Sequence, residues 1–246
     1  MDRLIYTALS GMQASMDRQR AIASNMANTD TLGFRAELIE QRAMTIEGHP
    51  NEARSMQVAR VTGADMTGGE VIETGRDLDL AIATKSLMAV QADDGTEAYT
   101  RRGDLSISAT GLLVTGDGHP VLGDTGPITV PPGGRISISE DGTVTRSAPD
   151  PPEAPPAEVG RIKLASWEGS PIAKGLDGLF RVEGGGILPL DEEARVHSGA
   201  LEQSNVKPTE VLVAMIEEQR LFAMRSKLVS TARQLDESGA QLMRLT

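Results

Sequence analysis

The chain has 246 residues, a formal net charge of −11 and an aromatic content of only 2%. This length can bury one large core or two small ones, but so few aromatic side chains are unusual for an enzyme, whose pocket they commonly line. The acidic charge argues against nucleic acids and anionic membranes as partners, because both attract a basic surface. The absence of cysteine excludes disulfide and thiolate chemistry.

The charge is unevenly distributed along the chain. Residues 1–36 and residues 207–246 each carry a net charge of +1, which leaves −13 for residues 37–206. This distribution is typical of packed terminal segments beside a solvated, self-repelling middle.

Residues 2–28 are predicted to form an amphipathic helix. Apolar side chains, among them Leu9, Met12 and Met16, recur at steps of three and four residues with charged side chains between them. A secretory signal needs an uninterrupted apolar region, and these charged side chains interrupt the segment, so no cleavable signal is expected here. No apolar run in the chain approaches the roughly 18 residues of a membrane-spanning helix.

Where this helix ends, the stretch SNMANTDTLGF (24–34) replaces apolar side chains with amides and hydroxyls. Asn25 and Asn28 are three positions apart and share a helix face. On its own the stretch indicates a frayed helix end followed by a loop. A counterpart, SGALEQSNVKP (198–208), places Ser204 and Asn205 at a second junction, so both junctions carry side chains that donate and accept hydrogen bonds.

The middle of the chain is predicted to be an antiparallel β domain over residues 66–206. Short apolar runs alternate with turn signals at intervals of about 8–12 residues. The proline-rich segment 149–158 is expected to hold no strand or helix, and residues 37–65 are interpreted as an extended connecting segment. The predicted strands are 78–83, 86–91, 104–108, 120–123, 127–130, 135–139, 142–146, 159–167 and 178–182.

A second long helix is predicted for residues 208–246, with Pro208 at its first position. Neither terminal helix has an apolar stripe wide enough for stability alone in water, so each must pack on the other, on the β region or on further copies. The predicted fold class is α+β. Residues 1–36 and 207–246 would pair as a coiled-coil-like helical domain that flanks the central antiparallel β domain.

Neither a metal site nor a catalytic constellation is predicted. His49, His119 and His197 are scattered without metal-ligand spacing and are expected to be exposed turn residues. Asp77 and Asp79 lie two apart on one strand, too close to flank a sugar ring, and are expected to face solvent. No nucleophile elbow or phosphate-binding loop is present, so the sequence predicts a protein that is not an enzyme and needs no cofactor.

Two terminal signatures resemble those of the rod–hook family of flagellar axial proteins. They are ALSGMQA…AIASNMANTDTLGFRA at one end and LEQSNVKPTEVLVAMIEEQRLFAMRSKLV at the other. Residues 63–82 and 97–144 follow the family's β region in order, so the resemblance covers the whole chain. The opening MDRLIYTALSG and the SNVKP junction are more similar to proximal than to distal rod members.

One segment departs from the family pattern. After LDLAI the family usually has a GxGFF-like turn and strand, whereas this chain has ATKSLMAVQ (83–91). Its apolar residues Leu87, Met88 and Val90 can still fill a strand.

The resemblance implies a structural subunit of the flagellar basal-body rod, exported unfolded by the flagellar type III apparatus without a cleaved signal. Subunits would polymerise helically into a hollow shaft that spans the periplasm, transmits torque and passes export substrates. The terminal helices would line the tube and the β domain would face outward. Implied partners are further copies and the rod proteins FlgB, FlgC and FlgG.

Two alternatives stay open. A distal rod subunit would have different neighbours and the same mechanism. A soluble envelope- or peptidoglycan-binding β module with helical dimerisation ends belongs to another functional class. Such a module should keep its function without residues 1–36, whereas a rod subunit should lose assembly.

The amides and hydroxyls of both junctions are predicted to bond adjacent subunits and to fix their register. Apolar contacts can slide, but a buried amide left unpaired costs about 1–3 kcal/mol. Heterologous contacts that do not close produce an open filament. The predicted subunit contacts are Leu9, Met12, Met16, Asn25, Asn28, Thr31, Gly33, Phe34, Leu201, Ser204, Asn205, Val206, Met215, Ile216, Phe222 and Leu228.

Overall fold

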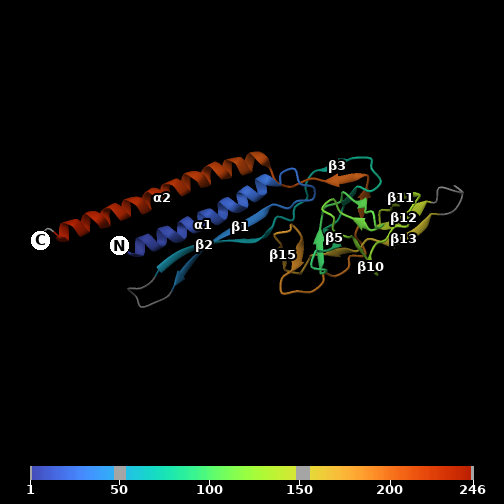
Figure 1. Cartoon of the computed structure of the whole chain (residues 1–246), viewed down its shortest axis with the longest axis horizontal. Helices are drawn as coiled ribbons and strands as arrows, with labels where there is room; N and C mark the ends of the chain where they lie inside the picture. The colour runs from blue at the N-terminus through green and yellow to red at the C-terminus, as the bar shows by residue number, and fades with distance from the viewer. Residues whose placement is uncertain (1, 47–53, 148–155, 245–246) are drawn as a thin grey trace. The chain divides into compact units, whose positions relative to one another are not determined.

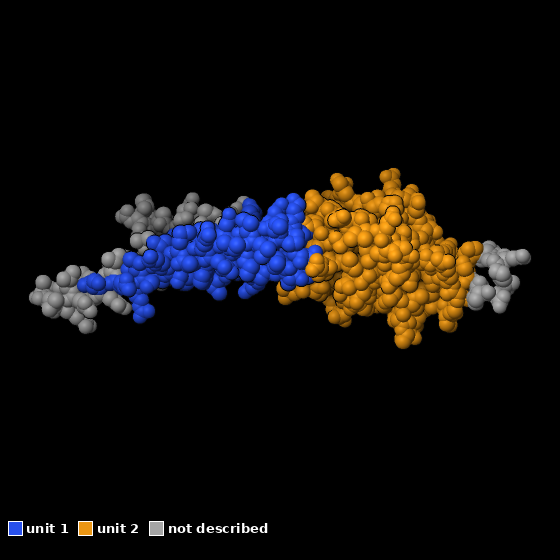
Figure 2. All heavy atoms as spheres, turned by 90° about the horizontal axis from the view of Figure 1, so that it is seen from above, with its two compact units in different colours: residues 1–29, 37–63, 206–246 blue, residues 30–36, 64–205 orange. Residues whose placement is uncertain are grey.

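The computed structural model of the chain (Figure 1) describes residues 2–46, 54–147 and 156–244. They form two compact units, coloured separately in Figure 2. Unit 1 consists of residues 1–29, 37–63 and 206–246, and unit 2 consists of residues 30–36 and 64–205. The α+β class predicted from the sequence is confirmed, with a helix near each end of the chain and antiparallel strands between them.

Unit 1 contains both helices, α1 (Asp2–Ala27) and α2 (Pro208–Arg244), which lie side by side and antiparallel (Figure 1). Both helix predictions are confirmed to within a residue where the chain is described. The segment 37–65 contains two paired strands, β1 (Glu37–Ile46) and β2 (Arg54–Ala64), and β1 contacts α1. Within the described part of the chain, neither helix is long and apolar enough to cross a bilayer.

Unit 2 is built from short antiparallel strands. Its largest sheet has the order β14–β5–β6–β16–β15, and a second sheet has the order β11–β12–β13. Four further pairs, β3–β18, β4–β17, β7–β8 and β9–β10, surround them. The strands are β3 (Val71–Glu73), β4 (Leu80–Ile82), β5 (Ser86–Gln91), β6 (Glu97–Thr100), β7 (Ser106–Ile107), β8 (Leu113–Val114), β9 (Leu122–Gly123), β10 (Gly126–Pro127), β11 (Arg135–Ile138), β12 (Thr143–Ser147), β13 (Ala157–Arg161), β14 (Leu164–Ser166), β15 (Ile172–Lys174), β16 (Phe180–Val182), β17 (Val196–Ser198) and β18 (Ala200–Glu202).

Strand β5, the segment that departs from the family pattern, is a core strand covered on both faces. Met88 and Val90 face one apolar cluster, and Leu87 and Ala89 face another. Alternate side chains of a strand point to opposite faces, so a strand buried on both faces needs a nearly continuous apolar run. SLMAVQ supplies that run, and its predicted strand coincides with β5.

Several strand predictions differ from the structure. The single strand predicted at 159–167 is two strands, β13 and β14, and β13 begins at Ala157, inside the segment expected to hold no strand. Residues 148–155 of that region lie outside the described residues. Strands β3, β6, β8, β15, β17 and β18 were not predicted, because two to four residues are too few to display a period of two.

Candidate assembly site

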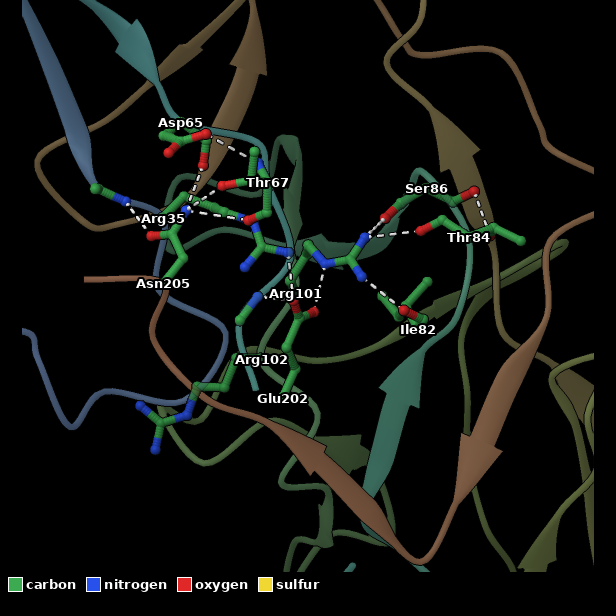
Figure 3. A network of polar contacts seen from close by, with 12 residues as sticks. Arg35, Asp65, Thr67, Ile82, Thr84, Ser86, Arg101, Arg102, Glu202 and Asn205 are labelled. Atoms are coloured by element: carbon green, nitrogen blue, oxygen red, sulfur yellow. Dashed lines mark hydrogen bonds and ion pairs between the residues drawn. The ribbon is translucent and has the colours of Figure 1, made fainter. Parts of the chain in front are cut away.

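A buried ion triad, Arg35, Arg101 and Glu202, joins the two ends of unit 2 (Figure 3). Arg35 Nη2 donates to Glu202 Oε1 at 2.6 Å, and Arg101 Nε donates to Oε2 at 2.7 Å. The Arg35 and Glu202 side chains are only 0% and 3% exposed. Since these two residues are 167 positions apart, the buried triad ties the first segment of unit 2 to its last.

The charges of the triad are compensated by further hydrogen bonds. Arg101 donates to the carbonyls of Ile82, Thr84 and Ser86 at 2.6–2.9 Å, and the Gly69 N–H donates to Glu202 Oε1 at 2.8 Å. Burial lowers the pKa of the Arg101 guanidinium, and the nearby Glu202 carboxylate opposes that shift. Burial of ions is tolerated only when such hydrogen bonds offset the lost hydration. Nε and Nη1 of Arg35 have no hydrogen-bond partner among the described residues.

Beside the triad, the side-chain amide of Asn205 forms hydrogen bonds to two neighbouring backbone segments, one at Ala36 and one at residues 65–67. Its Oδ1 accepts from the Ala36 N–H at 2.8 Å, and its Nδ2 donates to the carbonyls of Asp65 and Thr67 at 2.8 and 3.0 Å (Figure 3). Its backbone N–H donates to the Phe34 carbonyl at 3.3 Å. The single chain thus already engages both ends of this amide, and a bond to an adjacent subunit stays a prediction.

Gly33 and Phe34 pack closely against the residues next to the triad. Gly33 has φ +66°, and a Cβ there would lie 2.5 Å from the carbonyl carbon of Arg101. Its N–H donates to the Glu202 carbonyl at 2.8 Å. Phe34 is buried beneath Lys174, whose Nζ lies 3.2 Å from the ring centroid and donates to the Arg35 carbonyl. Only glycine fits this position, because both the backbone angle and the close approach exclude a side chain.

We expect Gly33→Ala to lower the stability of unit 2 by more than the roughly 1–3 kcal/mol of a strained backbone residue. Gly75→Ala is the matched control, because Gly75 has φ +70° and open space around its Cβ position. Trp167, the chain's single tryptophan, lies in unit 2, so its fluorescence reports this unfolding in urea. Equal losses in the two variants would show that the close approach to Arg101 contributes nothing.

The amides of Asn25 and Asn28, in the stretch 24–34, lie within unit 1 and fix the turn from α1 into β1. Asn25 Oδ1 accepts from the Glu37 N–H at 2.8 Å, and Asn25 Nδ2 donates to the Glu37 carbonyl at 3.1 Å. Ser24 Oγ donates to the Glu37 carboxylate at 2.9 Å. Asn28 Nδ2 donates to the Ser24 carbonyl at 2.8 Å, and the Asn28 backbone N–H donates to the same carbonyl at 3.2 Å, so both groups of Asn28 hold the last turn of the helix.

Over residues 7–27 the inner face of α1 is made mainly of small side chains, and Ile22 is the one large apolar side chain buried there. Ser10, Gly11, Ala14, Ser15 and Ala21 are buried. Leu9 and Met16, two predicted contact residues, are 51% and 56% exposed. Both are therefore free of close packing in the single chain, and their contact with another subunit stays a prediction.

Helix α2 has an inner face and a second, exposed apolar face. Phe222 is half-buried, whereas Met215, Ile216 and Leu228 are exposed. Exposed apolar side chains lie along one stripe of the helix: Leu221, Met224 and Leu228 follow at steps of three and four residues, and Val213 lies about two turns before Leu221, with the exposed Glu217 between them. This second seam consists of Val213, Leu221, Met224 and Leu228.

Of the remaining predicted contact residues, Met12 lies in the middle of α1 and the others lie near the two junctions. Met12 is half-buried on α1, and the Thr31 carbonyl accepts from the Phe34 N–H at 3.3 Å. Leu201 pairs with Ile72 across β18 and β3, Ser204 is half-buried and Val206 is buried. A role of these residues in subunit contact stays a prediction.

The residues considered for catalysis serve structural roles. Asp79 is buried and accepts from Thr74 Oγ1 and Arg76 Nε, so the expectation that it faces solvent is wrong. Asp77 pairs with Arg135, whose hydrogen bond lowers the pKa of the Asp77 carboxyl. Among the described residues no group of three His, Cys, Asp or Glu could hold a metal ion.

The histidine expectations also need correction. His119 is half-buried, with Nδ1 3.6 Å from an oxygen of Asp93. His197 is exposed as expected, yet it lies in strand β17 rather than in a turn. His49 lies outside the described residues.

Three segments of the chain match known protein families. Residues 5–35 match the family described as "Flagella basal body rod protein", residues 81–146 match "Flagellar hook protein FlgE/F/G D1 domain", and residues 197–242 match "Flagellar basal body rod FlgEFG protein C-terminal". The chain is 41% identical to the flagellar basal-body rod protein FlgF of Salmonella typhimurium over the full length of both. The chain belongs to the FlgF family of flagellar basal-body rod proteins.

Other relatives support the same placement. The chain is 42% identical to FlgF of Escherichia coli over 94% of each protein. It is 33% identical to the rod protein FlgG of Caulobacter vibrioides over 97% of this chain and 98% of the relative. FlgF therefore fits better than FlgG, and the FlgF family is one of structural rod proteins.

The buried triad takes one residue from each matched segment of this FlgF-family chain. Arg35 ends the first segment, Arg101 lies in the second and Glu202 in the third. Sequence reasoning missed all three, because an isolated Arg or Glu is usually solvated. The available signal was position, since Arg35 lies in LGFRA and Glu202 in LEQSN, within the two terminal signatures.

We expect Asn25→Leu and Asn205→Leu to impair swimming while unit 2 still folds. Asn25→Leu removes bonds within unit 1 only, and Asn205→Leu also lowers the stability of unit 2 by about 1–3 kcal/mol, the cost of unpaired polar groups. Soft-agar motility and Trp167 fluorescence measure the two effects. Gln203→Leu, an exposed neighbour, is the control. Full motility of the double variant, with normal rods, would disprove a role in register.

Proposed function

We propose that this FlgF-family chain is a non-enzymatic subunit of the proximal rod and assembles through its terminal helices. The observation that carries the proposal is the second seam of α2. One face of α2 packs within unit 1, while the second seam exposes four apolar side chains. A helix that is apolar on more than one face is stable when a further helix covers it.

The partner on the second seam would be a helix of another rod subunit. Leu9 and Met16 give α1 an exposed apolar face of its own, so one chain offers two different helical surfaces. Contacts between different surfaces are heterologous and extend into an open filament when the rotation does not close. Further copies and the FlgB-, FlgC- and FlgG-type rod proteins would supply the neighbours.

Charge supports an arrangement in which the helices form the tube wall and unit 2 faces outward. The terminal segments are nearly neutral, whereas residues 37–206 carry −13. Acidic bodies repel at close range, so they would be placed on the outside, where separation is largest. The resulting hollow rod would transmit torque through the periplasm and let unfolded export substrates pass. The subunit would reach it through the type III apparatus without a cleaved signal.

The proposal can be tested by expressing the chain in a flagellated host that lacks its own FlgF-type protein. Swimming cells, with the chain in isolated rods, are the expected result. A variant that begins at residue 30 is the sharpest comparison, because it removes α1 and keeps Arg35 in the buried triad. If the shortened variant still binds the cell envelope or peptidoglycan and is recovered in the envelope fraction, the result would favour a binding module over a rod subunit.

A further inference from the structure

A second cluster of charges lies between α1 and α2, inside unit 1. We call Arg18, Glu218 and Arg225 the interhelical cluster. The Glu218 side chain is only 1% exposed, and its Oε2 lies 3.4 Å from Arg18 Nε. Arg225 Nη1 lies 3.9 Å from Glu218 Oε1. A buried carboxylate on the seam of a helix pair needs an explanation, because apolar residues fill this position in most helix pairs.

The small residues of α1 make room for this cluster. Arg225 Nη1 donates to the Gly11 carbonyl at 2.8 Å and also to Ser15 Oγ. Ser15 is fully buried, and Ala14 beside it is nearly so. The face of α1 therefore accommodates one long arginine side chain from α2 and presents a carbonyl and a hydroxyl to its guanidinium.

The cluster does not maximise stability. Well-packed apolar residues often stabilise a fold more than a buried ion pair does, and Glu218 Oε1 has no hydrogen-bond partner among the described residues. What a polar contact adds is selectivity, since a buried polar residue in a helical seam fixes register and partner at a cost in stability. Sliding by one helical turn would separate Glu218 from Arg18 and Arg225 from Gly11.

We infer that the interhelical cluster fixes the register of α1 on the inner face of α2 and makes that face selective for a helix that carries Arg18, Gly11 and Ser15. The second seam has no buried charge and stays free for helices of other chains. The two faces of α2 thus differ in kind: the inner face selects its partner helix through polar contacts, and the second seam offers apolar contacts without such selection. This inference concerns pairing within one chain and does not depend on the proposed role in the rod.

The chain has no cysteine, so introduced pairs report helix register without background. Arg18 lies opposite Glu218, and equal helical rise in an antiparallel pair places Ala21 level with Met215, so Ala214 is the nearest residue on the inner face of α2. Ala21→Cys with Ala214→Cys reports the native register. Ala21→Cys with Val211→Cys reports a pair shifted by about one turn. The measured quantity is the ratio of the two disulfide formation rates in glutathione buffer, using the full chain.

We expect the native-register pair to form roughly tenfold faster than the shifted pair, and the ratio to fall below about threefold in Glu218→Leu/Arg225→Leu. Helix content by circular dichroism shows that the variant still folds. Arg220→Leu/Lys227→Leu also puts two leucines in place of charged residues, on the exposed side of α2 away from the interhelical cluster, and should leave the ratio unchanged.

Two outcomes would overturn the inference. One is a ratio in Glu218→Leu/Arg225→Leu that stays near tenfold, which would show that packing alone sets the register. The other is an equal fall in the Arg220→Leu/Lys227→Leu control, which would show that added leucine on another face of α2 also loosens the pair. Arg225→Lys keeps the charge and loses the planar donor group, so a partial fall there would support the contact with Gly11 and Ser15.

Discussion

Glu202→Ala is expected to lower the free energy of unfolding of unit 2 by about 3–5 kcal/mol, the usual cost of removing one partner from a buried ion pair. Without the carboxylate, Arg35 and Arg101 are both buried and repel each other, and the Gly69 N–H loses its acceptor. Urea unfolding followed by Trp167 fluorescence measures the loss. Glu202→Gln keeps the shape and removes only the charge, so it separates electrostatics from packing.

Glu73→Ala is the matched control for this prediction. Glu73 lies on β3, the strand that pairs with β18, but its side chain is exposed. Its replacement should change stability by less than about 0.5 kcal/mol, as is usual at the surface. A similar loss in Glu73→Ala and Glu202→Ala would show that the pairing of β3 and β18 is the sensitive feature, and that the buried triad is not.

A third variant separates the effect of the three charges from the effect of the side-chain volume that they occupy. Arg35→Met, Arg101→Met and Glu202→Leu together replace the triad by apolar side chains of similar length. No unpaired charge remains in this triple variant, but the carbonyls that Arg101 served and the Gly69 N–H lose their partners, so it should recover only the part of the loss that is due to charge. Its three substitutions touch one another, so their effects should be far from additive.

The parts of the structure that the sequence could predict are those with a repeating local pattern. Helices α1 and α2 repeat the 3.6-residue period over 26 and 37 residues, which is long enough to be unmistakable. Strand β5 was also predicted, because a run of apolar residues bounded by polar ones indicates a buried strand. The β3–β18 pair was missed, since each strand has three residues and its partner lies far along the chain.

The sites that depend on contacts distant in sequence could not be predicted from local patterns. Arg35 and Glu202 meet across 167 positions, and neither neighbourhood indicates an ion pair. The amides of Asn25 and Asn205 are predicted to bond adjacent subunits, which stays a prediction; within the chain they bond backbone groups of Glu37 and of Ala36, Asp65 and Thr67. Burial of Glu218 between two helices could not be predicted either, because a glutamate in a helix is nearly always solvated.

Met224→Glu/Leu228→Glu is expected to abolish swimming while the fold is retained. The two side chains are 57% and 65% exposed, so neither substitution removes packing from the single chain. In an assembled rod the same positions would lie against another helix. Each apolar side chain buried there contributes about 1.5–3 kcal/mol, and an unpaired carboxylate in its place costs several kcal/mol more. The loss recurs in every subunit, so a rod that needs all of its contacts should fail to form.

The measurements are swimming in soft agar, counts of rods in isolated basal bodies and Trp167 fluorescence during urea unfolding. Gln219→Glu/Ser226→Glu adds the same charge to a different exposed face of α2 and should leave swimming intact. If that control also abolishes swimming, added negative charge on α2 is harmful on any face. If cells with Met224→Glu/Leu228→Glu swim normally, the second seam is not a subunit contact and assembly must use another surface. The exposed face of α1 that carries Leu9 and Met16 would be the first such surface to test.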